Sequence, residues 1–316
     1  MIPASLRYWF DASSHTASAA DKSAPQIDWL RTVPFIGLHL CVLFVFVVGW
    51  SPVAIGLAIA LYAIRMFAIT GFYHRYFSHN AFRTGRVVQF VFALLGASAV
   101  QRGPLWWASH HRLHHVNADR DGDEHSPRRH GFLWSHMGWF LSRQNFASRL
   151  DRIQDFARYP ELRFLDRFDT LFPALLALGL YGLGELLENF WPELETNGWQ
   201  LLVWGFVIST VVLYHVTFSI NSLAHSLGHR RFATRDDSRN NWLLALLTFG
   251  EGWHNNHHFY PGSARQGFAW WEFDLTYYLL RLLQFVGLIE ALRPVPERVM
   301  QVRSRYPLKP DKRMAS

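Results

Sequence analysis

The chain has 316 residues, of which half are hydrophobic and 16% are aromatic. Its formal charge of +7 comes from 28 arginines and only 3 lysines, and arginine pairs readily with the phosphates of lipid headgroups. A soluble nucleic-acid-binding protein would also be basic, but it would not need long apolar segments, so no nucleic-acid partner is expected. The single cysteine, Cys41, excludes an internal disulfide and a Cys-x-x-Cys metal site.

Four apolar segments approach the length of about 20 residues that a helix needs to cross the hydrocarbon core of a bilayer. The sequence shows no signal-peptide core in its first 30 residues, so no cleaved leader is expected. Two further apolar stretches, 87–100 and 268–292, are better suited to the membrane interface or the protein interior. The predicted spans are residues 33–50, 53–73, 171–187 and 199–220.

Charge predicts the orientation of these spans. Fourteen arginines lie between residues 74 and 168, whereas the connection 188–198 holds three acids and no cation. Because cytoplasmic loops carry the excess of Lys and Arg, both termini and the 74–168 segment are expected in the cytoplasm. The sequence thus predicts an all-α integral membrane protein with two helical hairpins. Its expected parts are a cytosolic segment 1–32, a membrane domain 33–293 with a helical cytosolic cap from 74–168 and 221–293, and a basic tail 294–316.

The 17 histidines cluster at the predicted cytoplasmic ends of the second and fourth spans. The pattern His-x-x-His-His occurs twice, in 111–115 and 254–258, and Asn221 and His225 are also four residues apart. Residues at i, i+3 and i+4 share one helix face, so each triplet is expected to aim its imidazoles at a common point. The lack of Cys ligands and of an HExxH glutamate argues against the common zinc patterns. Eight or nine imidazoles exceed the roughly four to six ligands of one metal and predict two.

These motifs resemble those of the membrane fatty acid desaturases, and several strings are similar to the stearoyl-CoA, or delta-9, branch. The strings are GFYHRYFSH (71–79), HRLHHVNADRDGDEHSP (111–127), GFLWSHMGW (131–139), NSLAHSLG (221–228) and GEGWHNNHH (250–258).

The resemblance extends over about residues 33–290 and implies four transmembrane helices beneath a cytosolic cap. It implies a di-iron centre, in which zinc can replace iron in a recombinant structure, that uses O2 to introduce a cis double bond into a saturated acyl chain. It also implies nine histidine ligands and an asparagine that acts through a metal-bound water. By motif match the histidines are His74, His79, His111, His114, His115, His225, His254, His257 and His258, and the asparagine is Asn221.

One departure from the family concerns the carrier of the acyl chain. The animal acyl-CoA members have an Arg-Asp pair before the second histidine box, where this chain has Ser109-His110. Arg143 matches another basic position of the family only loosely. A long-chain acyl-CoA is the expected substrate, and an acyl chain on a membrane phospholipid is the alternative.

Two other functions stay open at this point. A di-iron lipid hydroxylase would need the same ligands, whereas a membrane metal transporter is disfavoured because the histidines lie at one end of the spans. The tail after residue 293 is too short for a cytochrome b5-like domain. The electron donor is therefore expected to be a separate protein, either a ferredoxin or a cytochrome b5-type protein with its reductase.

The remaining polar and aromatic residues carry secondary predictions. The acidic run 119–124 is expected to orient ligand histidines, with iron ligation and a solvated turn as alternatives. Arg65, inside the second span, is a functional candidate or a snorkelling side chain. Tryptophans beside the histidine boxes are candidates for core packing or for lining a narrow, bent substrate tunnel. These are Trp106, Trp107 and Trp253, while His39 and His215 are interpreted as bundle hydrogen-bond partners and His125, His130 and His136 as structural.

Overall fold

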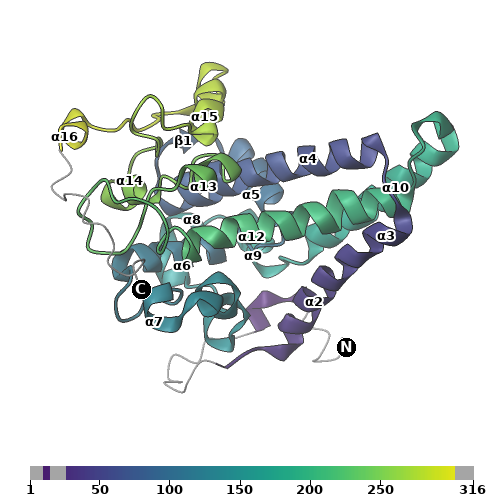
Figure 1. Cartoon of the computed structure of the whole chain (residues 1–316), viewed down its shortest axis with the longest axis horizontal. Coiled ribbons are helices and arrows are strands. Elements are labelled where there is room, and N and C mark those ends of the chain that lie inside the picture. The colour runs from purple at the N-terminus through teal and green to yellow at the C-terminus, as the bar shows by residue number, and fades with distance from the viewer. Residues whose placement is uncertain (1–9, 15–25, 303–316) are drawn as a thin grey trace, which may run out of the picture.

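The computed structural model describes residues 10–14 and 26–302, which form a mostly helical protein. Four of its helices are long and apolar enough to cross a membrane, as the sequence predicts. The second, third and fourth run side by side and the first crosses them obliquely, with the turn 191–197 at one end and a cap at the other (Figure 1). We call residues 79–170 and 223–302 the cap. The four helices are Trp29–Val48, Pro52–Ser78, Leu171–Phe190 and Gly198–Ser222.

Each of these four helices is continuous except for local changes of helical type. The first comprises α2 (Trp29–Leu40), η2 (Cys41–Phe44) and α3 (Val45–Val48), and the second comprises α4 (Pro52–Phe67) and η3 (Ala68–Ser78). The third is α10 (Leu171–Phe190), and the fourth comprises α11 (Gly198–Gln200), η9 (Leu201–Ile208) and α12 (Ser209–Ser222). Segment η9 packs against both α4 and α10, so the two hairpins form one bundle.

The two hairpin turns are fixed by capping residues and joined to each other. Ser51 caps α4 by accepting a hydrogen bond from the backbone of Ala54, and Pro52 occupies the first helical turn, where its missing N–H is tolerated. Asn197 caps α11 in the same way. The Ser51 hydroxyl also donates to the Thr196 hydroxyl at 2.8 Å, which ties the first hairpin to the second.

The second span extends further than its hydrophobic pattern predicts. The hydrophobic pattern predicts an end at residue 73, but the helix continues with wide turns to Ser78 and therefore carries His74. Its added polar residues are buried rather than solvated: Arg75 is 1% exposed and binds Glu251 and Asp274 of the cap. The helix continues because the cap, and not water, surrounds it.

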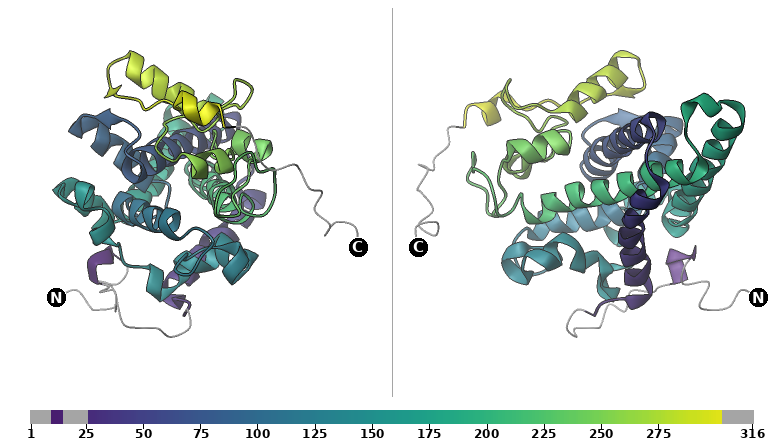
Figure 2. Two further views of the ribbon diagram at one scale, coloured as in Figure 1. Left: turned by 90° about the vertical axis from the view of Figure 1, so that its left-hand side faces the viewer. Right: turned by 45° about the vertical axis from the view of Figure 1, so that its right-hand side comes forward.

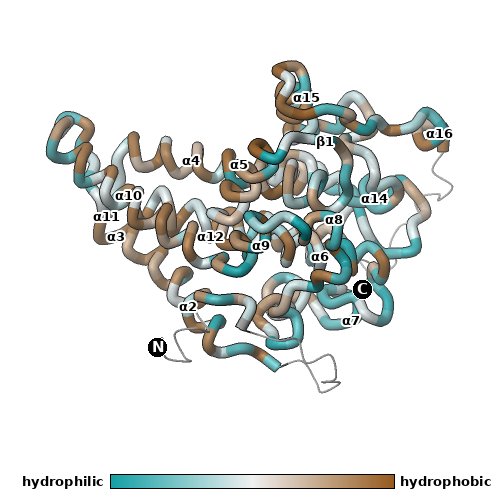
Figure 3. Tube along the Cα trace, turned by 180° about the vertical axis from the view of Figure 1, so that it is seen from behind, coloured by the Kyte–Doolittle hydropathy of each residue, from teal (hydrophilic) through white to brown (hydrophobic). Residues whose placement is uncertain are grey.

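The cap consists of short helices around a core that also includes η3. Phe72 of η3 stacks on Phe92 with ring centroids 3.9 Å apart, and Leu162 and Leu165 are buried in the same cluster. Apolar colour follows the long helices, whereas hydrophilic segments gather in the cap (Figure 3). The α-helices of the cap are α5 (Arg86–Ala97), α6 (Pro104–Asn117), α7 (Pro127–His130), α8 (Gln154–Ala157), α9 (Pro160–Arg167), α13 (Trp242–Leu247), α14 (His254–Phe259), α15 (Leu275–Phe285) and α16 (Glu297–Met300).

Short turns and one small sheet complete the described part. Strand β1 (Arg83–Thr84) pairs antiparallel with β2 (Ile289–Glu290), which joins the start of the cap to its end. The apolar stretch 87–100, predicted as too short to cross a membrane, lies mostly in α5. The amphipathic region 268–292 contains α15, which stands out from the bundle (Figure 2). The remaining turns are η1 (Ala12–Ser14), η4 (Trp134–Gly138), η5 (Trp139–Leu141), η6 (Arg143–Asn145), η7 (Leu150–Arg152) and η8 (Pro192–Leu194).

Polar residues inside the spans bind one another. Arg65 is fully buried and donates to the hydroxyls of Ser209 and Thr210, the latter at 2.8 Å. It is turned toward the fourth span, so the snorkelling alternative is wrong. His39 contacts His215 at 3.1 Å between their Nε2 atoms, which confirms the prediction that they are hydrogen-bond partners.

Candidate metal centre

The nine histidines of the sequence boxes lie in two groups, within each of which the possible ligand nitrogens are no more than 4.8 Å apart. The residues come from η3, α6, α14 and the segments just after η3 and α12. We call them the first and second histidine groups. The first is His74, His79, His111, His115 and His257, and the second is His114, His225, His254 and His258.

The two His-x-x-His-His helices each contribute to both groups. In α6, His111 and His115 belong to the first group, while His114 belongs to the second. On an α-helix, positions i+3 and i+4 lie on either side of position i, about 100° apart around the axis. The expectation that each triplet aims at one common point is therefore wrong. A single helix that lies between two sites can supply ligands to both.

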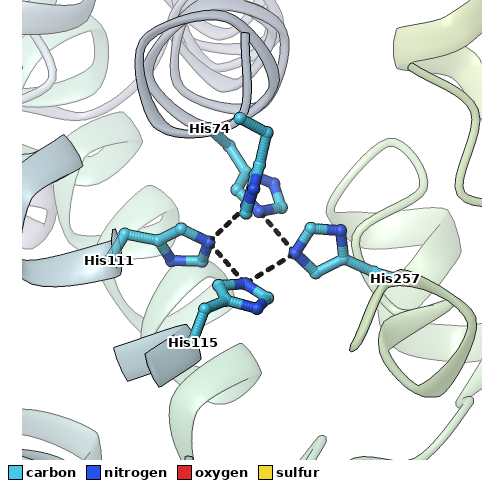
Figure 4. Close-up of side chains that lie close together, drawn as sticks. His74, His111, His115 and His257 are labelled. Carbon is cyan, nitrogen blue, oxygen red and sulfur yellow. Dashed lines mark hydrogen bonds between the residues drawn. The ribbon is translucent and has the colours of Figure 1, made fainter. Parts of the chain in front are cut away.

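Four imidazoles of the first group, those of His74, His111, His115 and His257, point toward one another (Figure 4). Nε2 of His257 lies 3.0 Å from that of His74 and 2.9 Å from that of His115. Nε2 of His111 lies 3.0 Å from that of His115 and 2.9 Å from that of His79. A neutral imidazole carries one N–H, so these nitrogens cannot all satisfy each other as donors.

Carboxylates fix the tautomer of four of these rings. Nδ1 of His225 donates to Asp119 at 2.8 Å, and Nδ1 of His258 donates to Asp236 at 3.1 Å. His114 is bound by Asp123 at 3.1 Å, and His74 contacts Glu251 in the same way. With the proton on Nδ1, each Nε2 presents a lone pair to the centre of its group. This is how outer carboxylates hold metal-ligating histidines.

Lone pairs that converge in a buried site need a cation or a proton between them. Nδ1 of His258 is hydrogen-bonded to Asp236, whereas its Nε2 is buried and has no hydrogen-bond partner within the described residues. Nε2 of His225 lies only 3.0 Å from Nε2 of His254. The donor set is neutral nitrogen with no cysteine, which suits iron as well as other borderline metals. The residues present therefore fit two metal ions, one in each group.

Burial keeps most of these imidazoles neutral. It lowers the pKa of His258 to about 4 and moves the pKa of several others well below the ordinary range. Those others are His79, His111, His115, His254 and His257. His114 differs: burial opposes its charge, but the carboxylates of Asp123, Asp119 and Asp236 together outweigh this effect and raise the pKa. Neutral imidazole is the form that binds metals.

The acidic run divides into two kinds of residue. Burial alone would raise the pKa values of Asp119 and Asp123, but their hydrogen bonds to histidines lower them, so both are anionic. Asp121 instead is exposed and paired with Arg129. The orienting role predicted for the run fits Asp119 and Asp123, and the solvated turn fits Asp121. Asp123 also lies beside His125, in a third group with His114.

Three residues that hold the histidines were not identified from the sequence. Glu251 contacts Nδ1 of His74, and Gln266 donates to Glu251 at 2.7 Å. Asp236 holds His258. A signal existed only for Glu251, which lies within the GEGWHNNHH string. Asn221, the predicted partner of a metal-bound water, lines the neighbouring cavity.

A mostly apolar cavity adjoins both histidine groups and is called the first cavity. His74 and His111 of the first group and His114 and His254 of the second line it. Trp106 and Trp107 line it as well, as expected of a substrate tunnel. Trp253 is not among the described residues that line it, because its indole N–H is turned away to the carbonyl of Phe273 at 2.7 Å.

Three hydrogen-bonded side chains, Gln101, Thr217 and Trp107, form part of the wall of the first cavity, and we call them the strut. The Gln101 amide donates to the Thr217 hydroxyl at 2.8 Å and accepts from the indole of Trp107 at 3.4 Å. All three residues line the cavity. The strut fixes the wall next to His111, because Trp107 stacks on that ring.

A second cavity of about 250 Å³ lies beside the first. Residues of α2, including Pro34 and Leu38, form one side, and Pro173 of α10 lies on another. The second cavity therefore lies between two of the long apolar helices. It shares four wall residues with the first cavity: Val100, Arg102, Phe140 and Tyr214.

Comparison with known proteins places this geometry in a family. The family described as fatty acid desaturase matches residues 48–287. The chain is 39% identical to an sn-1 stearoyl-lipid 9-desaturase of Anabaena variabilis, over 85% of this chain and 95% of that protein. It is 38% identical to the chloroplastic palmitoyl-monogalactosyldiacylglycerol delta-7 desaturase of Arabidopsis thaliana, over 89% and 72%. It is 37% identical to the acyl-CoA 5-desaturase AL21 of Anemone leveillei, over 83% and 78%.

Proposed function

Because this chain belongs to the fatty acid desaturase family and is an oxidoreductase of that kind, we propose that it places a cis double bond, at the delta-9 position, in a saturated acyl chain. The observation that carries the proposal is the pair of histidine groups beside one apolar cavity. The nine histidines are the proposed ligands of two irons. Asn221 is the proposed partner of a metal-bound water, since it lines the cavity that adjoins both groups.

The reaction sets what the site must do. Desaturation removes two hydrogens from neighbouring CH2 groups, and O2 is reduced to two waters with two further electrons and two protons from outside. Bound iron would supply the O2-derived oxidant, which no side-chain acid or base can replace. The chain itself holds the histidines with Asp119, Asp123, Asp236 and Glu251.

Placement in the first cavity accounts for the position of the double bond. An acyl chain has no polar group near its middle, so depth and shape must select the carbons that react. The Gln101–Thr217–Trp107 strut gives the cavity a rigid wall next to His111.

The carrier that we propose is a membrane glycerolipid. The second cavity supports this because it shares wall residues with the first and is lined by α2 and α10, the helices that a bilayer would surround. His110, which stands where acyl-CoA enzymes have an acid, is 2% exposed and engaged by Glu124 and the carbonyl of Ala147. Such a buried side chain is not available to a nucleotide. Acyl-CoA stays the second candidate, since two similar relatives are named as acyl-CoA desaturases.

The proposed orientation has both termini and the metal centre in the cytoplasm. It is supported by the 14 arginines between residues 74 and 168, which belong mostly to the cap. A reagent that cannot cross membranes should modify a tag at either terminus only in opened cells. Modification of a tag in intact cells would overturn the orientation.

The function is tested with iron-loaded protein in lipid vesicles that contain stearoyl glycerolipid, or with added stearoyl-CoA. An NADPH-dependent reductase and a ferredoxin supply the electrons. Mass spectrometry then locates the double bond. Delta-9 product in the glycerolipid supports the proposal, product only from stearoyl-CoA overturns the carrier, and a hydroxylated product overturns desaturation.

A further inference from the structure

Two surface segments, 117–131 and 229–240, lie side by side over the second histidine group. The backbone N–H of Asp237 donates to Oδ2 of Asp119 at 2.8 Å, and Arg128 lies 3.4 Å from the carboxylate of Asp237. The first segment contains α7, and both lie at the end of the molecule opposite the α10–α11 turn (Figure 1). We call these two segments the arginine face.

In the arginine face most carboxylates are buried, whereas the arginines lie at the surface. Asp119, Asp123 and Asp236 are buried, and each accepts a hydrogen bond from a histidine of the second group. Glu124 binds His110 and Arg149 instead of facing solvent. The charges left at the surface are mostly positive. They are Arg120, Arg128, Arg129, Arg230, Arg235 and Arg239, against the carboxylates of Asp121 and Asp237.

The arginine face also lies close to the metal centre. The carboxylate of Asp236 lies 3.1 Å from Nδ1 of His258, and Asp236 itself is 9% exposed. Asp237, the next residue, is 31% exposed at its side chain and is anchored to Asp119 by its backbone. A protein on this face would be separated from His258 of the second histidine group by one carboxylate, that of Asp236.

We propose that the arginine face is the docking site of an acidic protein that carries one electron at a time. The inference rests on the proposed function, which consumes two electrons from outside in each turnover. Two carrier molecules are each oxidised by one electron. These two electrons, the two electrons and two protons of the C–H bonds, and two protons from solvent reduce O2 to two waters. Complementary charge speeds such encounters and makes them sensitive to salt.

The test compares two double charge reversals in the full-length, iron-loaded protein in lipid nanodiscs. Arg128→Glu with Arg235→Glu alters the arginine face. Arg158→Glu with Arg163→Glu is the matched control, because both arginines are exposed elsewhere on the cap. The probe is an acidic [2Fe–2S] ferredoxin, and its Kd is measured at low and high salt. Desaturation is measured in parallel with the ferredoxin and with chemically reduced methyl viologen.

We expect the reversal of Arg128 and Arg235 to raise the Kd about tenfold, to flatten its salt dependence and to slow ferredoxin-driven turnover. Viologen-driven turnover should stay within about twofold of the wild type, since no ligand is touched. An unchanged Kd, an equal loss in the control pair, or no binding of ferredoxin to the wild type would overturn the proposal. Absence of viologen-driven desaturation in the wild type would instead refute the proposed function, because binding is read independently.

Discussion

Asp119 holds His225 through a hydrogen bond of 2.8 Å, and both side chains are 1% exposed. The carboxylate also accepts from the Ser126 hydroxyl at 2.6 Å, so its position is fixed from two sides. It keeps the proton of His225 on Nδ1 and leaves Nε2 for a metal. The second histidine group therefore depends on a residue that is not among the described residues lining the first cavity.

Substitution of Asp119 tests this dependence. Asp119→Asn removes the charge that orients His225, so iron affinity should fall by about 10- to 100-fold, and activity should fall with it. Titration of the metal-free protein with Fe(II) measures the affinity. Asp121→Asn is the control, because that side chain is 90% exposed. Equal affinity in the two variants would show that Asp119 does not position a ligand.

The metal-free protein should lose stability in acid. Most histidines of the two groups have pKa values below the roughly 6.5 of the unfolded chain, and that of His258 is about 4. The unfolded state thus binds more protons, so the stabilisation is fully present above about pH 6.5 and is lost as the pH falls toward about 4. The raised pKa of His114 opposes this trend with a single group. Thermal unfolding of chelator-treated protein between these pH values should show a falling Tm, and a flat profile would contradict it.

Arg65 should matter for stability and not for metal binding. It donates to Ser209 and Thr210 across the bundle and is fully buried. Arg65→Met removes these bonds and leaves two hydroxyls without their donor, at a cost of about 1–3 kcal/mol. Thermal unfolding in detergent should show the loss while the iron content per folded chain stays that of the wild type. A loss of iron without a change in Tm would assign Arg65 to the site instead.

The second cavity can be filled to test the lipid route. Leu38→Trp places a larger ring into this cavity from α2. It should lower desaturation of glycerolipid in vesicles by about tenfold or more, because placement of the chain governs the rate. Leu178→Trp is the control on the exposed surface of α10, where Leu178 is 69% exposed. Equal activity of both variants would exclude this cavity as the route.

The long helices and the histidine boxes could be predicted because their signals are local. A run of apolar residues reports a span, and the i, i+3, i+4 spacing reports a helix face. The division of His111 and His114 between two groups could not be predicted in this way. It depends on which elements lie on either side of α6, and those elements come from distant parts of the chain.

The residues that hold the histidines show the same limit. Asp119 and Asp123 stand close to the second box, so an orienting role could be inferred for that run. Asp236 lies 22 residues from His258, in a segment of charged residues that resembles ordinary surface. Its function appears only when the fold brings the two together. The orientation of the Arg65 side chain toward the fourth span likewise depends on tertiary contacts.

The central claim is that the two histidine groups each hold one iron. The most direct measurement is the iron content per chain of purified, reconstituted protein, in the wild type and in two variants. We predict about two irons in the wild type, as two complete ligand groups require. His111→Ala with His115→Ala, and separately His225→Ala with His254→Ala, should each leave about one. A wild type that desaturates with a single iron per chain, or variants that retain both irons, would contradict the account.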